Sequence, residues 1–305
     1  MNYAPIIKEI GRGAKGSRAL DRDAAASVFG DMLDQTVPGI ELGAILIALR
    51  VKSESLDELL GFKRAMDARC AQVAVPAGPR CVVLPSYNGA RRQANLMPLV
   101  AMLLAREGIP VLIQGRHDFE TRVSPLELLA ALDIQPARDA AAAGEQLAER
   151  RLACIGVDQL LPGLDALLAL RLRMGVRNSA HTMAKLLDPC HGRSVRVVAV
   201  THPEYLERMD AFLRVDGGHS MLLRGTEGEI YANPRRCPEM KTYANGEGRI
   251  AVAGEEGGAP PLAGLPDAPS VADNAALIRA MLAGEQAIPA PILAQVATLA
   301  ELARG

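Results

Sequence analysis

Two stretches of the sequence hold basic residues with no acidic residue among them. Residues 68–106 and 166–187 lack Asp and Glu, whereas residues 251–278 hold acids and neither Lys nor Arg. Most of the cations are arginines, whose planar guanidinium suits the oxygens of a phosphate. Charge segregated in this way predicts a surface that binds phosphate groups. The basic residues of the two stretches are Arg69, Arg80, Arg91, Arg92, Arg106, Arg171, Arg173, Arg177 and Lys185.

The whole chain has a formal net charge of −1, so its total charge does not attract polyanions. The same arginines therefore have a second interpretation, as solvated faces that only keep the protein in solution. Both interpretations stay open at the level of sequence.

A glycine-rich segment near the N-terminus adds further cations. Gly11, Gly13 and Gly16 match the GxGxxG pattern of dinucleotide-binding turns. That pattern requires a buried strand before it, and here it follows the polar, helix-like pair Lys8-Glu9. We interpret the segment as a flexible loop whose cations reach phosphates, and these cations are Arg12, Lys15 and Arg18.

Other side chains that carry chemistry give no support for a metal or hydrolytic site. The five cysteines form no CxxC pair, and the five histidines show no metal-ligand spacing, so we expect free thiols and no metal. Tyr87, Tyr231 and Tyr243 would serve either as stacking platforms for single strands or as packing residues. Because no apolar run reaches the roughly 18 residues of a membrane span, we expect a cytoplasmic protein.

The elements that position these residues change in character along the chain. The first seventy residues read as helices, the last of them capped by Ser55. A strand, a helix and a strand then follow within about thirty residues, which is typical of a parallel sheet covered on both faces. The predicted helices are residues 21–37, 40–50, 55–66, 98–106, 160–187, 203–213, 272–283 and 290–303, and the strands are 81–84, 109–113, 195–201 and 220–224, with a surface loop at 254–269.

Several motifs in this order resemble the anthranilate phosphoribosyltransferase and class II nucleoside phosphorylase superfamily, glycosyltransferase family 3. ALRVKSES at residues 48–55 and DELLGFKRAM at residues 57–66 are similar to the family's ALRxKGET and EEIxGxxxAM patterns. Residues 124–133, 170–178 and 273–285 extend the likeness. The resemblance implies an α/β fold with a small all-helical lobe and a larger α/β lobe that has a mostly parallel central sheet. The implied bounds are 1–72, rejoined by about 158–187, for the helical lobe, and 73–157 and 188–305 for the other.

The motifs with which that family binds its substrate are altered here. Its GTGGDG turn, whose backbone N–H groups close around a diphosphate carrying Mg²⁺, reads PSYNGA at residues 85–90. Its KHGN motif reads IQGR at residues 113–116, and its Mg²⁺-binding acidic pair reads Ile230-Tyr231. We expect a vestigial phosphate site without catalytic residues, formed by Ser86, Tyr87, Asn88, Gly89, Arg91, Arg92, Asn95, Gly115, Arg116 and His117.

Two features near these motifs are compatible with residual metal binding or acceptor binding. Glu227 and Glu229 precede the altered acidic pair and offer carboxylates for a rebuilt metal site. Arg171 falls at the family's position for the arginine that faces the aromatic acid acceptor, and it is retained. It also lies in the acid-free helical stretch, so it fits an electrostatic surface equally well.

A subgroup of this superfamily has a degraded site and a basic N-terminal loop, and its members bind DNA and RNA with little sequence preference as homodimers. The present chain resembles that subgroup. The resemblance implies a homodimer through the helical lobe that holds DNA or RNA by salt-sensitive contacts, with no cofactor and no membrane partner. The implied contact residues are Arg12, Lys15, Arg18, Arg171, Arg173, Arg177, Lys185, Arg235 and Arg236.

Two alternatives remain at this stage. The first is a phosphoribosyl- or nucleoside-directed transferase with an unorthodox phosphate site built from Arg91, Arg92, Arg116 and His117. Only that alternative would call for Mg²⁺. The second is a dimeric interaction protein that binds neither ligand.

Overall fold

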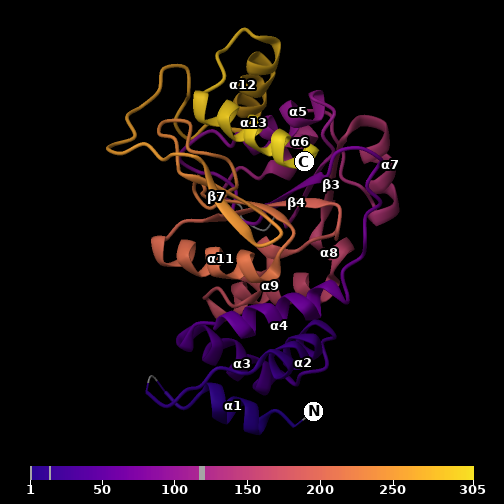
Figure 1. Cartoon of the computed structure of the whole chain (residues 1–305), viewed down its shortest axis with the longest axis vertical. Helices are drawn as coiled ribbons and strands as arrows, with labels where there is room; N and C mark the ends of the chain where they lie inside the picture. Colours follow the sequence, from indigo (N-terminus) through magenta and orange to yellow (C-terminus); the bar gives the residue numbers. More distant parts are fainter. Residues whose placement is uncertain (1, 14, 117–120) are drawn as a thin grey trace. The chain divides into compact units, whose positions relative to one another are not determined.

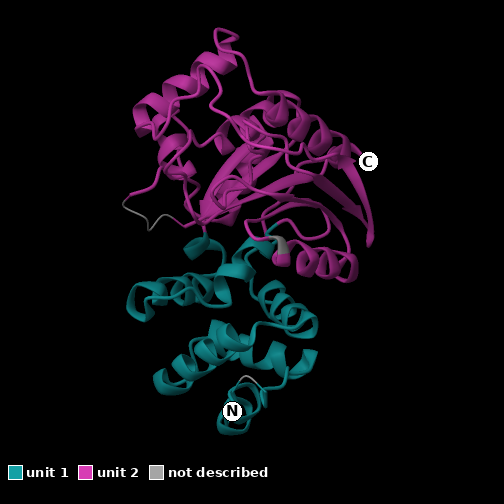
Figure 2. Cartoon of the chain, turned by 90° about the vertical axis from the view of Figure 1, so that its left-hand side faces the viewer, with its two compact units in different colours: residues 1–71, 157–189 teal, residues 72–156, 190–305 magenta. Residues whose placement is uncertain are grey.

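The computed structural model describes residues 2–13, 15–116 and 121–305 (Figure 1). It divides the chain into two compact units, each made of two segments (Figure 2). The helical unit comprises residues 1–71 and 157–189, and the α/β unit comprises residues 72–156 and 190–305. No helix in the described part of the chain is long and apolar enough to cross a membrane.

The helical unit is held together by well-capped helices in close contact. The helix α4 begins with a capping box in which the Ser55 side chain accepts from the Glu58 N–H and Glu58 accepts from the Ser55 N–H. Gly61 lets α4 approach α2, because a Cβ there would lie 2.5 Å from the Arg22 carbonyl oxygen. The helices are α1 (Ala4–Ile10), α2 (Arg22–Leu33), α3 (Gly39–Lys52), α4 (Leu56–Asp67), α8 (Val157–Leu160), α9 (Pro162–Met174) and α10 (Ala180–Met183), followed by the 3-10 helix η1 (Ala184–Leu186).

The α/β unit is built on a seven-stranded sheet with the order β3-β2-β1-β4-β5-β6-β7. The pairs from β3 to β5 are parallel, and the last two pairs are antiparallel. The strands are β1 (Cys81–Ser86), β2 (Val111–Gly115), β3 (Leu152–Gly156), β4 (Ser194–Val200), β5 (His219–Arg224), β6 (Met240–Ala244) and β7 (Glu247–Val252). The fold class is therefore as the resemblance implied, with a mostly parallel sheet in the larger lobe.

Helices cover both faces of this sheet (Figure 1). On one face, α5, α6, α12 and α13 share a single apolar core with alternate strand residues such as Val82 and Leu84 of β1. On the other face, α11 packs on β4 and β5. The helices of this unit are α5 (Met97–Arg106), α6 (Pro125–Ala131), α7 (Ala140–Arg150), α11 (Pro203–Asp216), α12 (Val271–Ala283) and α13 (Ala290–Arg304).

The strand order places a natural binding position beside the end of β1. The chain runs from β1 outward to β2 and β3 and then returns to the other side of β1 with β4, so the order reverses between β1 and β4. Open α/β sheets bind ligands outside the carboxyl ends of the strands at such a reversal. The register pairs Ser86 with Gly115, which brings the ends of β1 and β2 together.

Several helices and strands of the structure were not predicted from the sequence. The strands β3, β6 and β7 were not predicted. Strand β7 is largely exposed and carries charged residues, so it lacks the apolar run of a buried strand. Helices α1, α6, α7 and α8 were also missed. The predicted strand at residues 109–113 instead runs from Val111 to Gly115, so Gln114 and Gly115 belong to β2. Residues 254–269 form no helix or strand, as expected of a surface loop.

Candidate functional site at the end of β1

The turn after β1 has a backbone path that only glycine can follow at one position. Gly89 has a φ of +67°, and a Cβ there would lie 2.9 Å from the carbonyl oxygen of Val123. Ala90 pairs with Val123 in a short antiparallel bridge, which fixes the far side of the turn. The one glycine retained from the family's glycine-rich motif is therefore required by the geometry of the turn.

A carboxylate of the chain itself occupies this turn. Glu229 Oε1 accepts hydrogen bonds from the N–H groups of Asn88 at 3.0 Å and Gly89 at 2.7 Å. Glu229 Oε2 accepts from the Ser86 hydroxyl at 3.0 Å, and the whole residue is buried. Converging backbone N–H groups form an anion-binding nest, and here the bound anion is an internal side chain.

A second carboxylate lies against the next part of the same turn. Glu227 accepts hydrogen bonds from the N–H groups of Arg91 at 3.1 Å, Arg92 at 2.8 Å and Gln93 at 2.9 Å. Asn88 closes the loop by donating its side-chain N–H to the Gly228 carbonyl at 2.8 Å. Five backbone donors of the turn are thus bonded to two glutamates more than 130 residues away in the sequence.

This arrangement does not fit a diphosphate with Mg²⁺. The carboxylates of Glu227 and Glu229 face backbone N–H groups, and Ile230 and Tyr231 are buried apolar and aromatic side chains. Within the residues that the structure describes, no group of three His, Cys, Asp or Glu side chains could hold a metal ion. The two glutamates that the sequence offered for a rebuilt metal site are instead ligands of the turn.

The other residues predicted for the vestigial site gather at the same edge of the sheet. The Arg116 N–H donates to the Ser86 carbonyl at 3.1 Å, and the Asn95 side chain donates to the Val123 carbonyl at 3.0 Å. Gly115 is needed at its position, because a Cβ there would lie 2.0 Å from the Ser86 carbonyl oxygen. Arg91 and Arg92 are exposed. His117 lies outside the described residues.

The three tyrosines are packing residues, so the interpretation of them as stacking platforms for single strands is wrong. Tyr87 is 6% exposed and donates its hydroxyl to the Gln114 side chain. Tyr231 and Tyr243 are fully buried, and their hydroxyls donate to the Ala94 carbonyl and to Asp210. A buried ring cannot stack on a nucleic-acid base, so these residues pack the α/β unit.

The basic loop and the segment after α9 both lie beside the C-terminal end of α3. A groove between α1 and α3 is lined by Gly13 and Ser17 of the basic loop together with Lys52 of α3. At the same end of α3, Arg50 donates a hydrogen bond to the Arg177 carbonyl at 2.8 Å. Arg50 was not among the predicted phosphate contacts, and it bonds to the second basic stretch. Arg12, Lys15 and Arg18 of the basic loop and Arg173 of α9 are exposed.

A buried histidine lies close to several of these cations. His181 is 9% exposed, and burial together with the nearby charges of Arg177, Arg171 and Arg50 lowers its pKa to about 4. Burial disfavours the charged imidazolium, and neighbouring cations repel it further. His181 is therefore neutral at neutral pH and adds no charge to the cluster.

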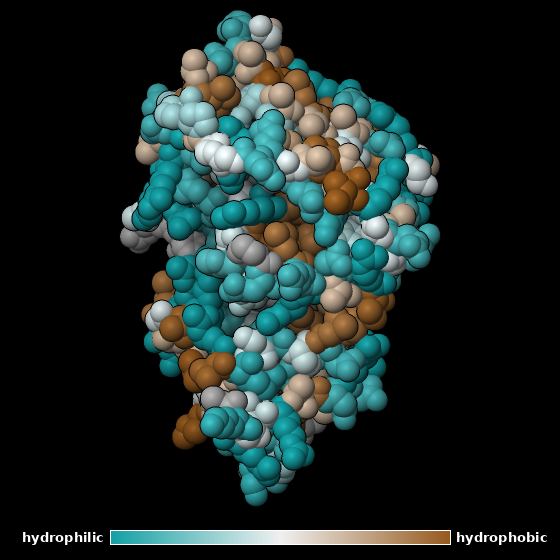
Figure 3. Space-filling view, turned by 60° about the vertical axis from the view of Figure 1, so that its left-hand side comes forward, coloured by the Kyte–Doolittle hydropathy of each residue, from teal (hydrophilic) through white to brown (hydrophobic). Residues whose placement is uncertain are grey.

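One face of α3 exposes apolar side chains. Ile40, Ile47 and Val51 are 88%, 42% and 74% exposed, and their spacing of seven and four residues places them along one side of the helix. The space-filling view shows apolar patches that interrupt a mainly hydrophilic surface (Figure 3). Exposed apolar residues grouped in this way are typical of a contact surface.

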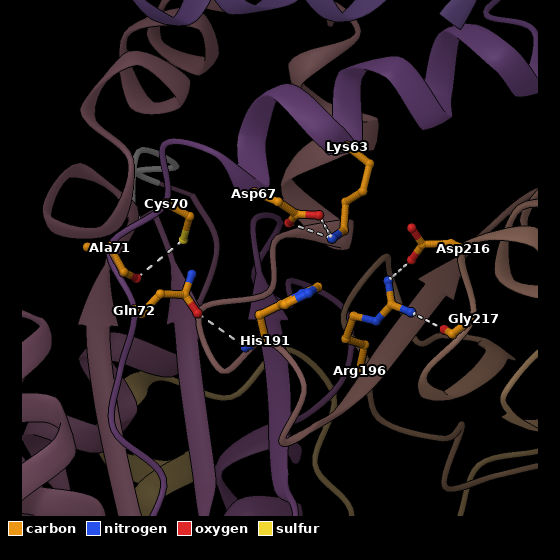
Figure 4. Close-up of polar contacts among 9 residues, drawn as sticks. All are labelled: Lys63, Asp67, Cys70, Ala71, Gln72, His191, Arg196, Asp216 and Gly217. Carbon is orange, nitrogen blue, oxygen red and sulfur yellow. Dashed lines mark hydrogen bonds and ion pairs between the residues drawn. The ribbon is translucent and has the colours of Figure 1, made fainter.

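Other basic residues are held by partners within their own unit. Figure 4 shows Lys63 Nζ at 2.6 Å from both carboxylate oxygens of Asp67, and Arg196 bound to Asp216 and to the Gly217 carbonyl. Of the predicted nucleic-acid contacts, Arg235 pairs with Asp267 at 2.5 Å and Arg236 donates to the Gly257 carbonyl. These last two belong to the α/β unit, whereas the cations around α3 belong to the helical unit.

The cysteines are free and buried, as expected for thiols without a disulfide framework. Burial raises the pKa of Cys70 to about 12 and that of Cys154 to about 11, which disfavours the reactive thiolate. Cys190 is buried whereas its neighbour His191 is exposed, and the His191 N–H donates to the Gln72 side chain at 3.3 Å (Figure 4).

Comparisons with known proteins agree with this architecture. Residues 4–70 match the glycosyl transferase family helical bundle domain. The uncharacterized protein YbiB of Escherichia coli is 42% identical over 299 residues, covering 97% of this chain and 93% of that protein. The anthranilate phosphoribosyltransferase of Paramagnetospirillum magneticum is 27% identical over 296 residues, covering 94% of this chain and 84% of the enzyme.

Solved structures show the same fold. The anthranilate phosphoribosyltransferase of Thermus thermophilus superposes with a TM-score of 0.76 at 22% identity, covering 97% of this chain and 87% of that one. The enzyme of Saccharomyces cerevisiae superposes with a TM-score of 0.73 at 13% identity, covering 96% and 85%. With its helical bundle, its mostly parallel sheet and these relatives, the chain belongs to the anthranilate phosphoribosyltransferase-like superfamily of glycosyltransferase family 3.

Proposed function

We propose that this protein binds DNA or RNA without sequence preference, through the cations around the C-terminal end of α3, as a homodimer. The observation that carries the proposal is the group of exposed cations in the helical unit. Arg12, Lys15 and Arg173 have no side-chain partner within the described part of the chain, so their charge is available to a ligand. Exposed cations grouped on one surface attract the phosphate backbone of any sequence.

The filled turn after β1 supports a function other than phosphoribosyl transfer. Transfer from a phosphoribosyl diphosphate depends on holding and neutralising the diphosphate. Here a diphosphate would have to displace the carboxylates of Glu227 and Glu229, and it would be repelled by them until it did. A fold shared with transferases does not by itself carry their reaction.

The exposed apolar face of α3 supports the homodimer. Ile40 and Val51 would leave water if a second copy of the helical unit covered them, and burying apolar surface contributes about 25 cal/mol per Å². Light scattering after size exclusion should give a dimer for the wild type and a monomer for Val51→Asp. Ile250→Asp on β7 is a matched control, because Ile250 is also exposed, at 57%, but in the α/β unit.

One titration series tests nucleic-acid binding. Anisotropy of a labelled oligonucleotide should show an affinity that falls steeply with salt, in keeping with about 6–10 neutralised phosphates for the dimer. Arg12→Gln with Lys15→Gln should weaken it, whereas Arg138→Gln with Arg150→Gln, two exposed cations of the α/β unit, should not. Tight binding of phosphoribosyl diphosphate with Mg²⁺ by calorimetry, without salt-sensitive oligonucleotide binding, would contradict the proposal.

The alternative of a transferase rests on the relatives and on Arg91 and Arg92. The named relatives other than the uncharacterized protein of Escherichia coli are anthranilate phosphoribosyltransferases, and the resemblance places Arg171 at the position of the arginine that faces the acceptor. Arg91 and Arg92 are exposed next to the turn and would be cations for an unorthodox phosphate site, with Arg116 and His117. Release of diphosphate when the protein is incubated with phosphoribosyl diphosphate, Mg²⁺ and an aromatic acid or a base would favour this alternative.

A further inference from the structure

The segment between β7 and α12 covers two arginines of the α/β unit, and we call residues 254–268 of this segment the strap (Figure 1). Asp267 of the strap accepts a hydrogen bond from the Arg235 guanidinium at 2.5 Å. The Gly257 carbonyl accepts one from the Arg236 guanidinium. The Arg235 side chain is 14% exposed, whereas that of Asp267 is 73% exposed, so the strap lies on the outer side of this arginine.

The strap is attached mainly by polar contacts at its two ends. At one end, the Cys237 N–H donates to the Glu255 carboxylate at 2.8 Å, and the Glu255 N–H donates to the Cys237 carbonyl at 2.9 Å. At the other end, the Ala268 N–H donates to the Arg92 carbonyl at 3.1 Å. The residues between these contacts are exposed except for Leu265, which packs partly against the apolar core. A segment with so little buried apolar surface opens more readily than the core elements beside it.

Arg235 has an unused hydrogen-bond donor under the strap. Asp267 is bonded to the Nη2 atom of this arginine. The Nε atom is buried and has no hydrogen-bond partner in the described part of the chain. A guanidinium binds a phosphate through two parallel N–H groups. A phosphate in the place of Asp267 would therefore satisfy both donors of Arg235.

The strap has the charge of a competing polyanion. It contains Glu255, Glu256 and Asp267 but no Lys or Arg. The groups that bind the two arginines are carboxylate and carbonyl oxygens, and a phosphodiester offers oxygen acceptors that share a negative charge in the same way. Because Asp267 is largely exposed, its pairing with Arg235 is screened by water and salt. The densely charged backbone of a nucleic acid can therefore displace it.

A cavity beside the strap limits where a polyanion can lie. Its volume is about 590 Å³, and Glu255 of the strap lines it together with Arg236. The other carboxylates that line it are Glu207, Asp210, Glu227 and Glu239. These like charges repel a phosphate from the interior of the cavity. A polyanion is therefore expected along the two arginines and outside the cavity.

We propose that the strap is autoinhibitory: it holds Arg235 and Arg236 until the phosphate backbone of a nucleic acid displaces it and binds both arginines. The inference rests on the proposed function, to which it adds a second contact surface in the α/β unit. In the exchange, each guanidinium passes from an oxygen of the strap to a phosphate oxygen, and Arg235 gains a bond through Nε. The carboxylates of the strap then face water, where they are solvated.

Anisotropy of a labelled single-stranded oligonucleotide tests the strap in the full chain. The strap variant Asp267→Asn with Glu255→Gln should bind about three- to tenfold more tightly than the wild type, because the strap then has fewer charges with which to compete. Adding Arg235→Gln and Arg236→Gln should remove this gain, since the arginines that the strap releases are then absent. A strap variant with the affinity of the wild type would overturn the proposal.

The matched control removes the same charge at another place in the α/β unit. Glu145→Gln with Glu149→Gln changes two exposed glutamates of α7. Helix α7 packs on β3, at the opposite edge of the sheet from β6 and β7. The control should therefore stay within about twofold of the wild-type affinity, because screening weakens distant charges. A gain as large as that of the strap variant would assign the effect to net charge and overturn the proposal.

Hydrogen exchange on the unmodified protein covers the case in which the strap variant does not fold. The amides of Glu255 and Ala268 are held by the contacts at the two ends of the strap. Both should exchange faster when saturating oligonucleotide is bound, because the displaced strap loses these contacts. Unchanged or slower exchange in the bound protein would overturn this inference and leave the proposed function intact. Absence of oligonucleotide binding by both the wild type and the strap variant would contradict the proposed function and this inference with it.

Discussion

The turn after β1 and the basic surface around α3 differ in whether their polar groups are bonded within the chain. In the turn, the backbone N–H groups of residues 88, 89 and 91–93 are bonded to Glu227 and Glu229, two carboxylates of the same chain. Around α3, the exposed cations Arg12, Lys15 and Arg173 have no acidic partner among the described residues. A group that is satisfied within the chain contributes to stability, and a group that is left unsatisfied at the surface is available for binding. The comparison shows that a charged side chain stabilises the fold or is available to a ligand according to the partners that surround it.

The largest effect should come from removing the buried carboxylate. Glu229→Ala leaves two buried N–H groups and the Ser86 hydroxyl without their acceptor, so we expect a loss of about 3 kcal/mol or more in the free energy of unfolding. Urea denaturation measures it. Glu149→Ala, an exposed glutamate of α7, should change stability by less than about 0.5 kcal/mol. Equal stabilities of the two variants would show that Glu229 does not hold the turn.

The buried histidine in the basic region should make stability depend on pH. The pKa of His181 is lowered from 6.5 to about 4 in the folded protein, so the unfolded chain binds more protons between these values. The free energy of unfolding should therefore fall as the pH drops from about 6.5 to about 4, by about 3 kcal/mol from this residue. Urea denaturation at several pH values measures it. His181→Gln should have the shallower dependence, and identical curves would refute the assignment.

Removing unpartnered cations should change binding but not stability. Arg12→Gln with Lys15→Gln should lower the slope of log affinity against log salt by about 2 for each protomer that uses both cations. The loss in affinity at low salt should be about tenfold, which equals about 1.4 kcal/mol. Anisotropy measures the affinity, and thermal unfolding should stay unchanged because both side chains are exposed. An unchanged slope would mean that the basic loop does not contact phosphate.

The smallest change in oligonucleotide affinity is expected at the weak ion pair between Arg18 and Glu9. Arg18 lies 3.9 Å from Glu9, with side-chain exposures of 75% and 35%, so the pair contributes little to stability. Glu9→Gln removes a competing carboxylate and should raise oligonucleotide affinity by about twofold at most, in keeping with the weak pairing of exposed charges. The same anisotropy assay measures this change. A loss of affinity would mean that Arg18 needs Glu9 to hold its position.

Local patterns in the sequence predict the elements with strong periodicity but not the ligands of the turn. Ser55 was predicted as the N-cap of α4, and Pro85 to Ala90 was recognised as an altered phosphate turn. Glu229 lies 143 residues after Ser86 in the sequence, and no local pattern links the two. Arg50 was overlooked for a similar reason, since its contact with Arg177 joins residues 127 apart.

The long sequence separation between Glu229 and Ser86 also bears on how the protein folds. Contacts between distant residues form only after the chain between them has closed its loop, and closing it costs entropy. The bonds to Glu229 join the end of β1 to the segment that follows β5, so most of the α/β unit lies between the bonded residues in sequence. They should therefore be weak in the transition state for folding. Loss of the Glu229 carboxylate should then speed unfolding far more than it slows refolding. The carboxylate therefore stabilises the protein mainly by slowing its unfolding.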